Sequence, residues 1–129
     1  MKKILGIFII FILVMLFSTK TEAMTFTEAY KEVDTKPIAV LVYAQWADKY
    51  QDCVNAFRQS QSGFVNKYNF VELDIATPDT KTFNAKYNIY PDLPYVLILK
   101  DSGKLFRFVK KDCILDNSCI SNRLYLYSQ

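Results

Sequence analysis

Apolar residues follow the short period of β-strands in four segments of the chain. Residues 38–44 (IAVLVYA) form an almost continuous apolar run, which is typical of a strand that is buried on both faces. Residues 70–75 (FVELDI) alternate apolar with charged side chains, as a strand with one solvent-facing side does. Two further strands are predicted to begin at Tyr95 and Leu105, and a tight turn at Gly103 separates them.

Between these strands the apolar residues recur at a spacing of three or four, which is typical of helices. The first predicted helix begins at Thr25, which lies three residues before Glu28 as in a capping box. The last one begins after Asp116 or Asn117, because either residue caps a helix well. The predicted helices cover approximately residues 25–33, 46–60, 77–89 and 117–127.

The order of these elements predicts an α/β protein with one small mixed sheet. Strands that are separated by helices favour parallel pairing through right-handed crossovers. The last two strands are joined only by the turn KDSGK (residues 100–104), so they form an antiparallel hairpin. We therefore expect about four strands with helices on both faces of the sheet.

The first 23 residues are predicted to be a secretion signal and not part of the fold. Lys2 and Lys3 precede an uninterrupted apolar stretch from Ile4 to Phe17, which is shorter than a spanning helix requires. Small residues at Thr21 and Ala23 favour cleavage after Ala23. We expect residues 24–129 to form one domain that is exported to the periplasm or secreted by a bacterium. The alternative is an uncleaved membrane anchor.

Composition excludes several classes of partner and cofactor from the expected function. Of the 16 basic and 13 acidic residues of the chain, three basic and one acidic lie within residues 1–23. The predicted domain therefore has 13 basic and 12 acidic residues. A nearly neutral domain of this kind argues against nucleic acid as a partner. We also expect no membrane contact after the signal is cleaved. The chain has no histidine, which removes the commonest metal ligand and general base, so we expect no metal and no cofactor.

Two segments of the sequence resemble thioredoxins: KPIAVLVYAQWADKY (residues 36–50) and NIYPDLPYVLILKDSGKLFRF (residues 88–108). With the order of elements, the resemblance covers nearly all of the predicted domain and implies a thioredoxin-like fold. Trp46 matches the tryptophan that precedes the family's Cys-x-x-Cys motif. Pro94 matches the family's cis-proline, so the resemblance implies a cis peptide bond between Leu93 and Pro94.

The same resemblance implies that the family's redox chemistry is missing. Ala47 and Tyr50 occupy the two cysteine positions, and Leu41 occupies the position of the buried acid that moves protons. Alanine has no thiol to ionise at the helix N-terminus, and tyrosine does not resolve a mixed disulfide. We therefore expect no dithiol exchange at this position.

The three cysteines of the chain have other predicted roles. Cys53 lies six residues beyond Ala47, about 9 Å along the helix, among apolar neighbours. We interpret it as a buried core residue, with a reactive single thiol as the alternative. Cys113 leaves the last strand and Cys119 enters the last helix, a spacing that favours a structural disulfide. The alternatives are two free thiols and a displaced redox pair.

Glu72 and Asp74 are two carboxylates on the same face of the second strand. Such a pair is compatible with acid–base chemistry, but an ion pair or a solvated strand face is the simpler interpretation. We expect no catalytic role for them.

Two functional hypotheses follow from the sequence. In the first, the protein is a redox-inactive module of the cell envelope that binds a protein or an extended peptide. The candidate contact residues are Trp46, Tyr50, Leu93, Pro94 and Tyr95. In the second, it is a thiol-disulfide oxidoreductase that uses Cys113 with Cys119, or Cys53 alone. A structural subunit of a secretion or conjugation apparatus is a variant of the first hypothesis.

Overall fold

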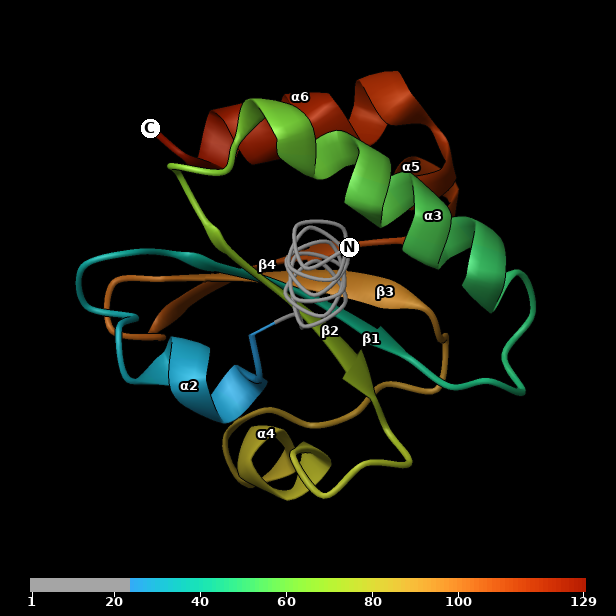
Figure 1. Ribbon diagram of the computed structural model, residues 1–129, viewed down its shortest axis with the longest axis horizontal. Helices are drawn as coiled ribbons and strands as arrows, with labels where there is room; N and C mark the ends of the chain where they lie inside the picture. The colour runs from blue at the N-terminus through green and yellow to red at the C-terminus, as the bar shows by residue number, and fades with distance from the viewer. Residues whose placement is uncertain (1–23) are drawn as a thin grey trace, which may run out of the picture.

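The computed structural model describes residues 24–129, so the predicted secretion signal (residues 1–23) lies outside the described residues. A four-stranded sheet runs through the middle of the domain, with helices on both faces (Figure 1). This architecture confirms the predicted α/β class. The strands are β1 (Ile38–Tyr43), β2 (Asn69–Asp74), β3 (Tyr95–Lys100) and β4 (Leu105–Val109). The helices are α2 (Phe26–Tyr30), α3 (Tyr50–Ser60), α4 (Thr80–Lys86), α5 (Lys111–Leu115), α6 (Asn117–Tyr127) and the 3-10 helix η1 (Gln61–Gly63).

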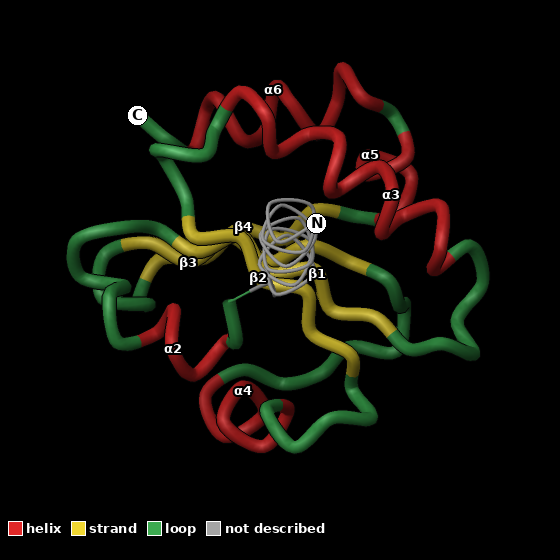
Figure 2. Tube along the Cα trace, viewed as in Figure 1, coloured by secondary structure: helices red, strands yellow, loops and turns green. Residues whose placement is uncertain are grey.

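The sheet is mixed, with the strand order β2-β1-β3-β4 (Figure 2). Strand β1 pairs in parallel with β2 and antiparallel with β3, so that Val40 lies between Val71 and Leu97. Strands β3 and β4 form the predicted antiparallel hairpin, whose turn includes Gly103 with a φ of +79°. A residue with a Cβ atom rarely adopts such a φ, which explains the glycine.

One predicted pairing direction is wrong. The helix between β2 and β3 led us to expect a parallel crossover, but β3 begins at the same end of the sheet where β1 ends, with Val42 opposite Tyr95. Strand β2 ends at that same end, with Tyr43 opposite Asp74, and α4 then follows the face of the sheet until Tyr87 donates its hydroxyl to the carbonyl of Gly103 (2.8 Å) near the other end. Residues 88–94 bring the chain back before β3 begins, so β3 runs in the opposite direction to β1.

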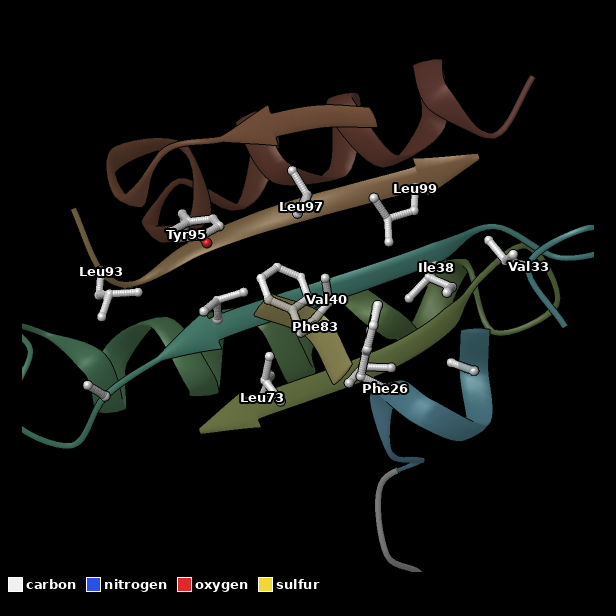
Figure 3. Close-up of a cluster of buried hydrophobic side chains, with 14 of the residues drawn as sticks. Phe26, Val33, Ile38, Val40, Leu73, Phe83, Leu93, Tyr95, Leu97 and Leu99 are labelled. Carbon is white, nitrogen blue, oxygen red and sulfur yellow. The ribbon is translucent and has the colours of Figure 1, made fainter. Parts of the chain in front are cut away.

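Alternate residues of β1 serve two separate cores. Ile38, Val40 and Val42 belong to a cluster that packs against α2 and α4, shown in Figure 3 with Phe26 and Phe83. Ala39 and Leu41 belong to a second cluster, formed with the helices on the other face. The almost continuous apolar run of β1 is thus explained by burial on both faces, as the sequence predicts.

The helices differ from the prediction at four places. Helix α4 spans Thr80–Lys86 and is shorter at both ends than the predicted 77–89. Helix α3 begins at Tyr50 and not at Trp46, because residues 45–49 form turns that end with Lys49 in a left-handed conformation, φ 59°. Helix α2 ends at Tyr30. Helix α5 was not predicted, because five residues are too few to show a helical period. No helix within residues 24–129 has the length and apolar character needed to cross a bilayer.

Candidate functional site

The turn after β1 carries the most exposed large apolar side chain of the described domain. The backbone N–H of Ala47 donates to the carbonyl of Ala44 (3.0 Å), and that of Tyr50 donates to the carbonyl of Ala47 (3.3 Å). These bonds fold residues 44–50 into two consecutive turns at the carboxyl end of the central strand. Trp46 lies in the first of these turns, and 75% of its surface is exposed. A large indole held in water by an ordered turn is typical of a contact residue.

A shallow pocket of about 320 Å³ lies beside Trp46. The segments after β1 and β2 line it together, since those two parallel strands end at the same edge of the sheet. Its walls are mostly apolar, and the amide of Gln45 donates to the Asp74 carboxylate (3.2 Å) across it. The lining residues are Ala44, Gln45, Trp46, Asp74, Ile75 and Ala76. A pocket of this size accommodates one side chain of a bound segment.

Ala47 and Tyr50 are packing residues in the structure. Ala47 is buried in the core cluster below α2 and α4. Tyr50 is half-buried and its ring stacks on that of Tyr43, with the ring centroids 6.0 Å apart. Burial, and then the negative charge of Asp74, raises the pKa of Tyr43, so its hydroxyl stays protonated at neutral pH. Positions 47 and 50 thus hold a buried methyl group and a stacked aromatic ring.

Two buried residues, Leu41 and Cys53, lie behind this turn. Leu41 is fully buried among apolar side chains of the second core. Cys53 lies in the same core with 0% of its surface exposed. Burial raises the pKa of the Cys53 thiol to about 11, so at neutral pH it is neither ionised nor accessible. This confirms the interpretation of Cys53 as a core residue.

The loop before β3 differs from the expectation for a binding surface. The peptide bond between Leu93 and Pro94 is cis. However, Leu93 has only 5% of its side chain exposed, Pro94 is buried, and Tyr95 is 0% exposed. The Tyr95 ring stacks on Phe108 at 4.7 Å between centroids. These three side chains complete the core instead of facing solvent, so contact of this segment with a partner through its backbone stays a prediction.

Other residues of this loop are exposed in their place. Tyr90, Pro91 and Asp92 face solvent, and the backbone N–H of Leu93 is bonded to the carbonyl of Pro91 (2.9 Å). The Tyr90 ring packs edge-on against Tyr95 (5.6 Å between centroids). Tyr90 is not among the contact residues that the sequence predicts, since its only signal is its position next to the proline-rich turn. Trp46 and Tyr50 remain as the predicted contact residues that the structure leaves accessible.

Cys113 and Cys119 form a disulfide bond, which confirms the predicted pairing. Their Cα atoms are 5.1 Å apart, and the bond joins α5 to the first turn of α6. Cys113 lies in α5 and not in a loop, because that helix was not predicted. The Asp116 carboxylate accepts hydrogen bonds from the N–H groups of Ser118 (3.1 Å) and Cys119 (3.3 Å). Its negative charge occupies the helix N-terminus and disfavours a thiolate there.

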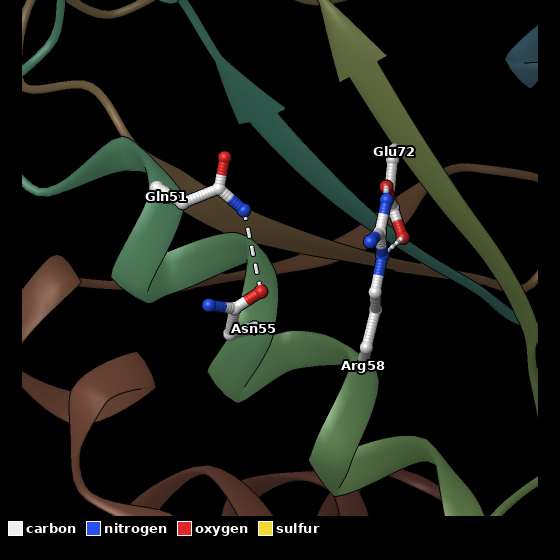
Figure 4. A network of polar contacts seen from close by, with 4 residues as sticks. All are labelled: Gln51, Asn55, Arg58 and Glu72. Carbon is white, nitrogen blue, oxygen red and sulfur yellow. Dashed lines mark hydrogen bonds and ion pairs between the residues drawn. The ribbon is translucent and has the colours of Figure 1, made fainter.

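The two carboxylates of β2 have separate partners. Glu72 forms a bidentate ion pair with Arg58 of α3, at 2.8 Å for both bonds (Figure 4). Asp74 accepts a hydrogen bond from the backbone N–H of Ala76 (2.9 Å). These contacts agree with a structural role for both residues. Residues 24–129 contain no group of three or more Cys, Asp or Glu arranged to hold a metal ion.

Comparisons with known proteins identify the fold. No family model and no curated protein match the chain. Solved structures of thioredoxins do. Thioredoxin from Malassezia sympodialis superposes with a TM-score of 0.64 at 14% identity, covering 81% of this chain and 89% of that one. Deadhead, a germline-specific thioredoxin from Drosophila melanogaster, gives 0.60 at 14% identity, covering 82% and 97%. Chloroplastic thioredoxin z gives 0.60 at 17% identity, covering 83% and 93%.

At these identities the similarity establishes the fold. The chain is a thioredoxin-fold protein, as its sequence resemblance predicts.

Proposed function

We propose that this protein is an exported thioredoxin-fold module that binds an extended segment of a partner protein and does not exchange disulfides at the usual position. The observation that carries the proposal is the exposed Trp46 beside an apolar pocket, at the end of the sheet where Ala47 and Tyr50 replace reactive groups. The turn is ordered for contact and has no chemistry of its own.

The proposed absence of disulfide exchange is supported by the residues at three positions. Ala47 has no ionisable group, Tyr50 is stacked on Tyr43, and Leu41 places a buried aliphatic chain where a proton carrier would be needed. The remaining thiol on α3, Cys53, is buried with a raised pKa. Disulfide exchange requires an accessible thiolate, and the turn offers none.

The binding function rests on the surface around the turn. Trp46 and half-buried Tyr50 offer aromatic contact area at little entropic cost, and tryptophan and tyrosine dominate the energetics of many interfaces. The adjacent pocket accepts one apolar side chain, and exposed Tyr90 and Asp92 lie on the neighbouring loop. An extended peptide can contact the Trp46 side chain and place one of its own side chains in the adjacent pocket, which a compact ligand fits less well.

The proposed location in the cell envelope rests on the sequence and on the disulfide. Residues 1–23 have the basic start and the apolar stretch of a secretion signal. The Cys113–Cys119 bond is stable in an oxidising compartment and rare in a reducing one. Mass spectrometry of the protein from the periplasm should find a chain that begins at Met24. A chain that keeps residues 1–23 would contradict cleavage and favour the membrane anchor.

The binding proposal has a direct spectroscopic test, because Trp46 is the only tryptophan of the chain. Random peptides displayed on phage are selected on the wild-type protein, with the Trp46→Ala variant as the counter-selection. Titration of the selected peptides should shift the Trp46 emission to shorter wavelength, since binding removes the indole from water. Peptides that bind Trp46→Ala equally well, or that leave the emission unchanged, would contradict the proposed site.

The redox part is tested by insulin reduction with dithiothreitol as the electron donor. We expect no turnover, with one thiol titrated only after unfolding and two more only after reduction. Turnover that is abolished by Cys113→Ser would overturn the proposal in favour of an oxidoreductase at the α5–α6 disulfide.

A further inference from the structure

The two outer strands of the sheet have very different edges. Within residues 24–129, β2 and β4 each have a neighbouring strand on one side only. The backbone N–H and C=O groups on the outer side of an edge strand are available to pair with another extended chain. Proteins usually protect such edges, so an edge that is left accessible can be a binding site.

Strand β2 is the protected edge. Its side chains are alternately buried and half-buried, and Val71 and Leu73 lie in the core. Arg58 of α3 reaches Glu72 and neutralises it, as Figure 4 shows. The other acid, Asp74, is bonded to Gln45 and to the backbone after the strand.

Strand β4 exposes apolar side chains instead. Phe106 and Phe108 have 46% and 39% of their surfaces exposed on the face that holds α2 and α4. Aromatic rings flank them: Tyr87 lies 6.2 Å from Phe106, and Tyr90 lies 5.3 Å from Phe108, between ring centroids. Together they form an aromatic strip along the edge strand.

The same strand is basic. Residues 104–111 contain Lys104, Arg107, Lys110 and Lys111 and no acid, although Asp101 and Asp112 lie just beyond the two ends. Among the described residues the only ion pair is Arg58–Glu72, so these four cations have no carboxylate partner. Arg107 lies on the opposite face from the aromatic strip, 5.8 Å from the centre of the Tyr127 ring.

We propose that the β4 edge binds an extended acidic segment of a partner protein as an added fifth strand. Its alternate apolar side chains lie beside Phe106 and Phe108, and its acidic side chains lie beside Arg107 on the other face. Further acids at its ends meet Lys104 and Lys110. This surface shares the loop of Tyr90 with the proposed Trp46 surface, but it does not include Trp46 and does not depend on the function proposed there.

A second copy of the chain fits this edge poorly. Antiparallel pairing of β4 with itself about Arg107 would place Arg107 opposite Arg107, and Lys104 opposite Lys110. Like charges directly opposite one another destabilise a strand pair. The unpaired cations therefore select an acidic partner over self-association.

The test uses two capped heptapeptides, one of alternating valine and glutamate and one of alternating valine and lysine. Amide NMR spectra of the full domain (residues 24–129) should show shifts and slowed hydrogen exchange in β4 with the glutamate peptide only. Arg107→Glu should lower its affinity about tenfold, because an attractive pair becomes a repulsive one. Raising the salt concentration should also weaken binding.

Lys67→Glu is the matched control, since it makes the same charge change at an exposed position just before β2. It should change the affinity by less than about twofold if the contact is local. Equal losses in both variants, shifts outside β4, or no binding of the glutamate peptide would overturn the proposal. Shifts in β4 that grow with protein concentration alone would indicate a second copy as the occupant. Loss of binding in Trp46→Ala would assign the peptide to the Trp46 turn and equally overturn binding at β4.

Discussion

Two segments meet at the carboxyl end of the central strand, and the structure treats them in opposite ways. The turn at residues 44–49 holds Trp46 in solvent, whereas the loop at residues 88–94 leads into Tyr95, which is fully buried. Both segments carry large aromatic and apolar side chains next to a strand end. Their sequences alone suggest the same role, yet the aromatic side chain of one faces solvent and that of the other completes the core.

The difference follows from where each aromatic lies relative to the hydrogen-bonded sheet. Tyr95 is the first residue of β3 and pairs with Val42, so its side chain is directed onto the core face and meets Phe108. Trp46 comes three residues after the end of β1, in a turn whose backbone bonds hold it beyond the sheet. A residue inside a strand has a direction that the pleat imposes, while a residue in a turn does not.

The strongest test of this difference is Tyr95→Ala. Removing a fully buried aromatic ring should lower the free energy of unfolding by about 3 to 5 kcal/mol, since it leaves a cavity beside Phe108. Urea denaturation followed by circular dichroism measures the change. Tyr95→Phe is the control, because the hydroxyl makes only long contacts with Asn88 and Tyr90 (3.5 and 3.4 Å). A small loss for Tyr95→Ala would mean that the loop is a surface after all.

The next test removes the α5–α6 disulfide, which stabilises a region away from the turn. The double variant Cys113→Ser/Cys119→Ser should be less stable by about 2 kcal/mol, the chain-entropy value for so short a loop. The native Trp46 emission should not change, because the turn keeps its own backbone bonds. A shifted native emission would show that the disulfide also orders the turn.

Alkaline pH tests the thiol buried behind the turn. The pKa of Cys53 rises from 9.0 to about 11 on folding, so the folded state holds the proton more tightly than the unfolded state. The protonated thiol therefore stabilises the folded state fully below about pH 9, and this contribution, about 3 kcal/mol at most, is lost as the pH rises through about 11.

Cys53→Ala should therefore make stability fall less steeply over this range than in the wild type. Burial also raises the pKa of Tyr68, Tyr87 and Tyr95, so part of the alkaline loss will remain in the variant. Identical pH profiles for the two proteins would argue against a protonated, buried thiol.

The smallest effect on stability is expected for Trp46→Ala. Its indole is mostly in water, so the free energy of unfolding should change by no more than about 0.5 kcal/mol, while binding of a selected peptide is lost. Calorimetry of folding and of peptide binding gives both quantities on one sample. A loss of stability like that of Tyr95→Ala would remove the distinction between the two segments.

The sequence predicted the fold well, because the type of each strand and helix depends largely on local patterns. The two-sided burial of β1, the β3–β4 hairpin and the Cys113–Cys119 bond were all predicted. Prediction was poorer for α5 and for the direction of β3. The first is too short to show a period, and the second depends on the length of the whole connection after β2.

The candidate site was predicted only in part. The Trp46 turn follows from its place in a motif, but the exposure of a side chain depends on residues far away in the sequence. Phe108, thirteen positions after Tyr95, fills the space that would otherwise open that ring to solvent. The exposed aromatic strip of β4 gave no local signal either, since an alternating strand reads the same at an edge as in the middle of a sheet.

The sequence by itself determined which groups stand at the end of the central strand: Trp46 is present, and Ala47 and Tyr50 leave no reactive thiol. Chemistry of this kind is a property of residue identity, so no packing restores it. Only the tertiary structure decided which side chains face solvent, burying Leu93, Pro94 and Tyr95 and exposing Trp46 and the basic β4 edge. Burial is set by contacts between distant segments, and the local pattern of a sequence does not contain them.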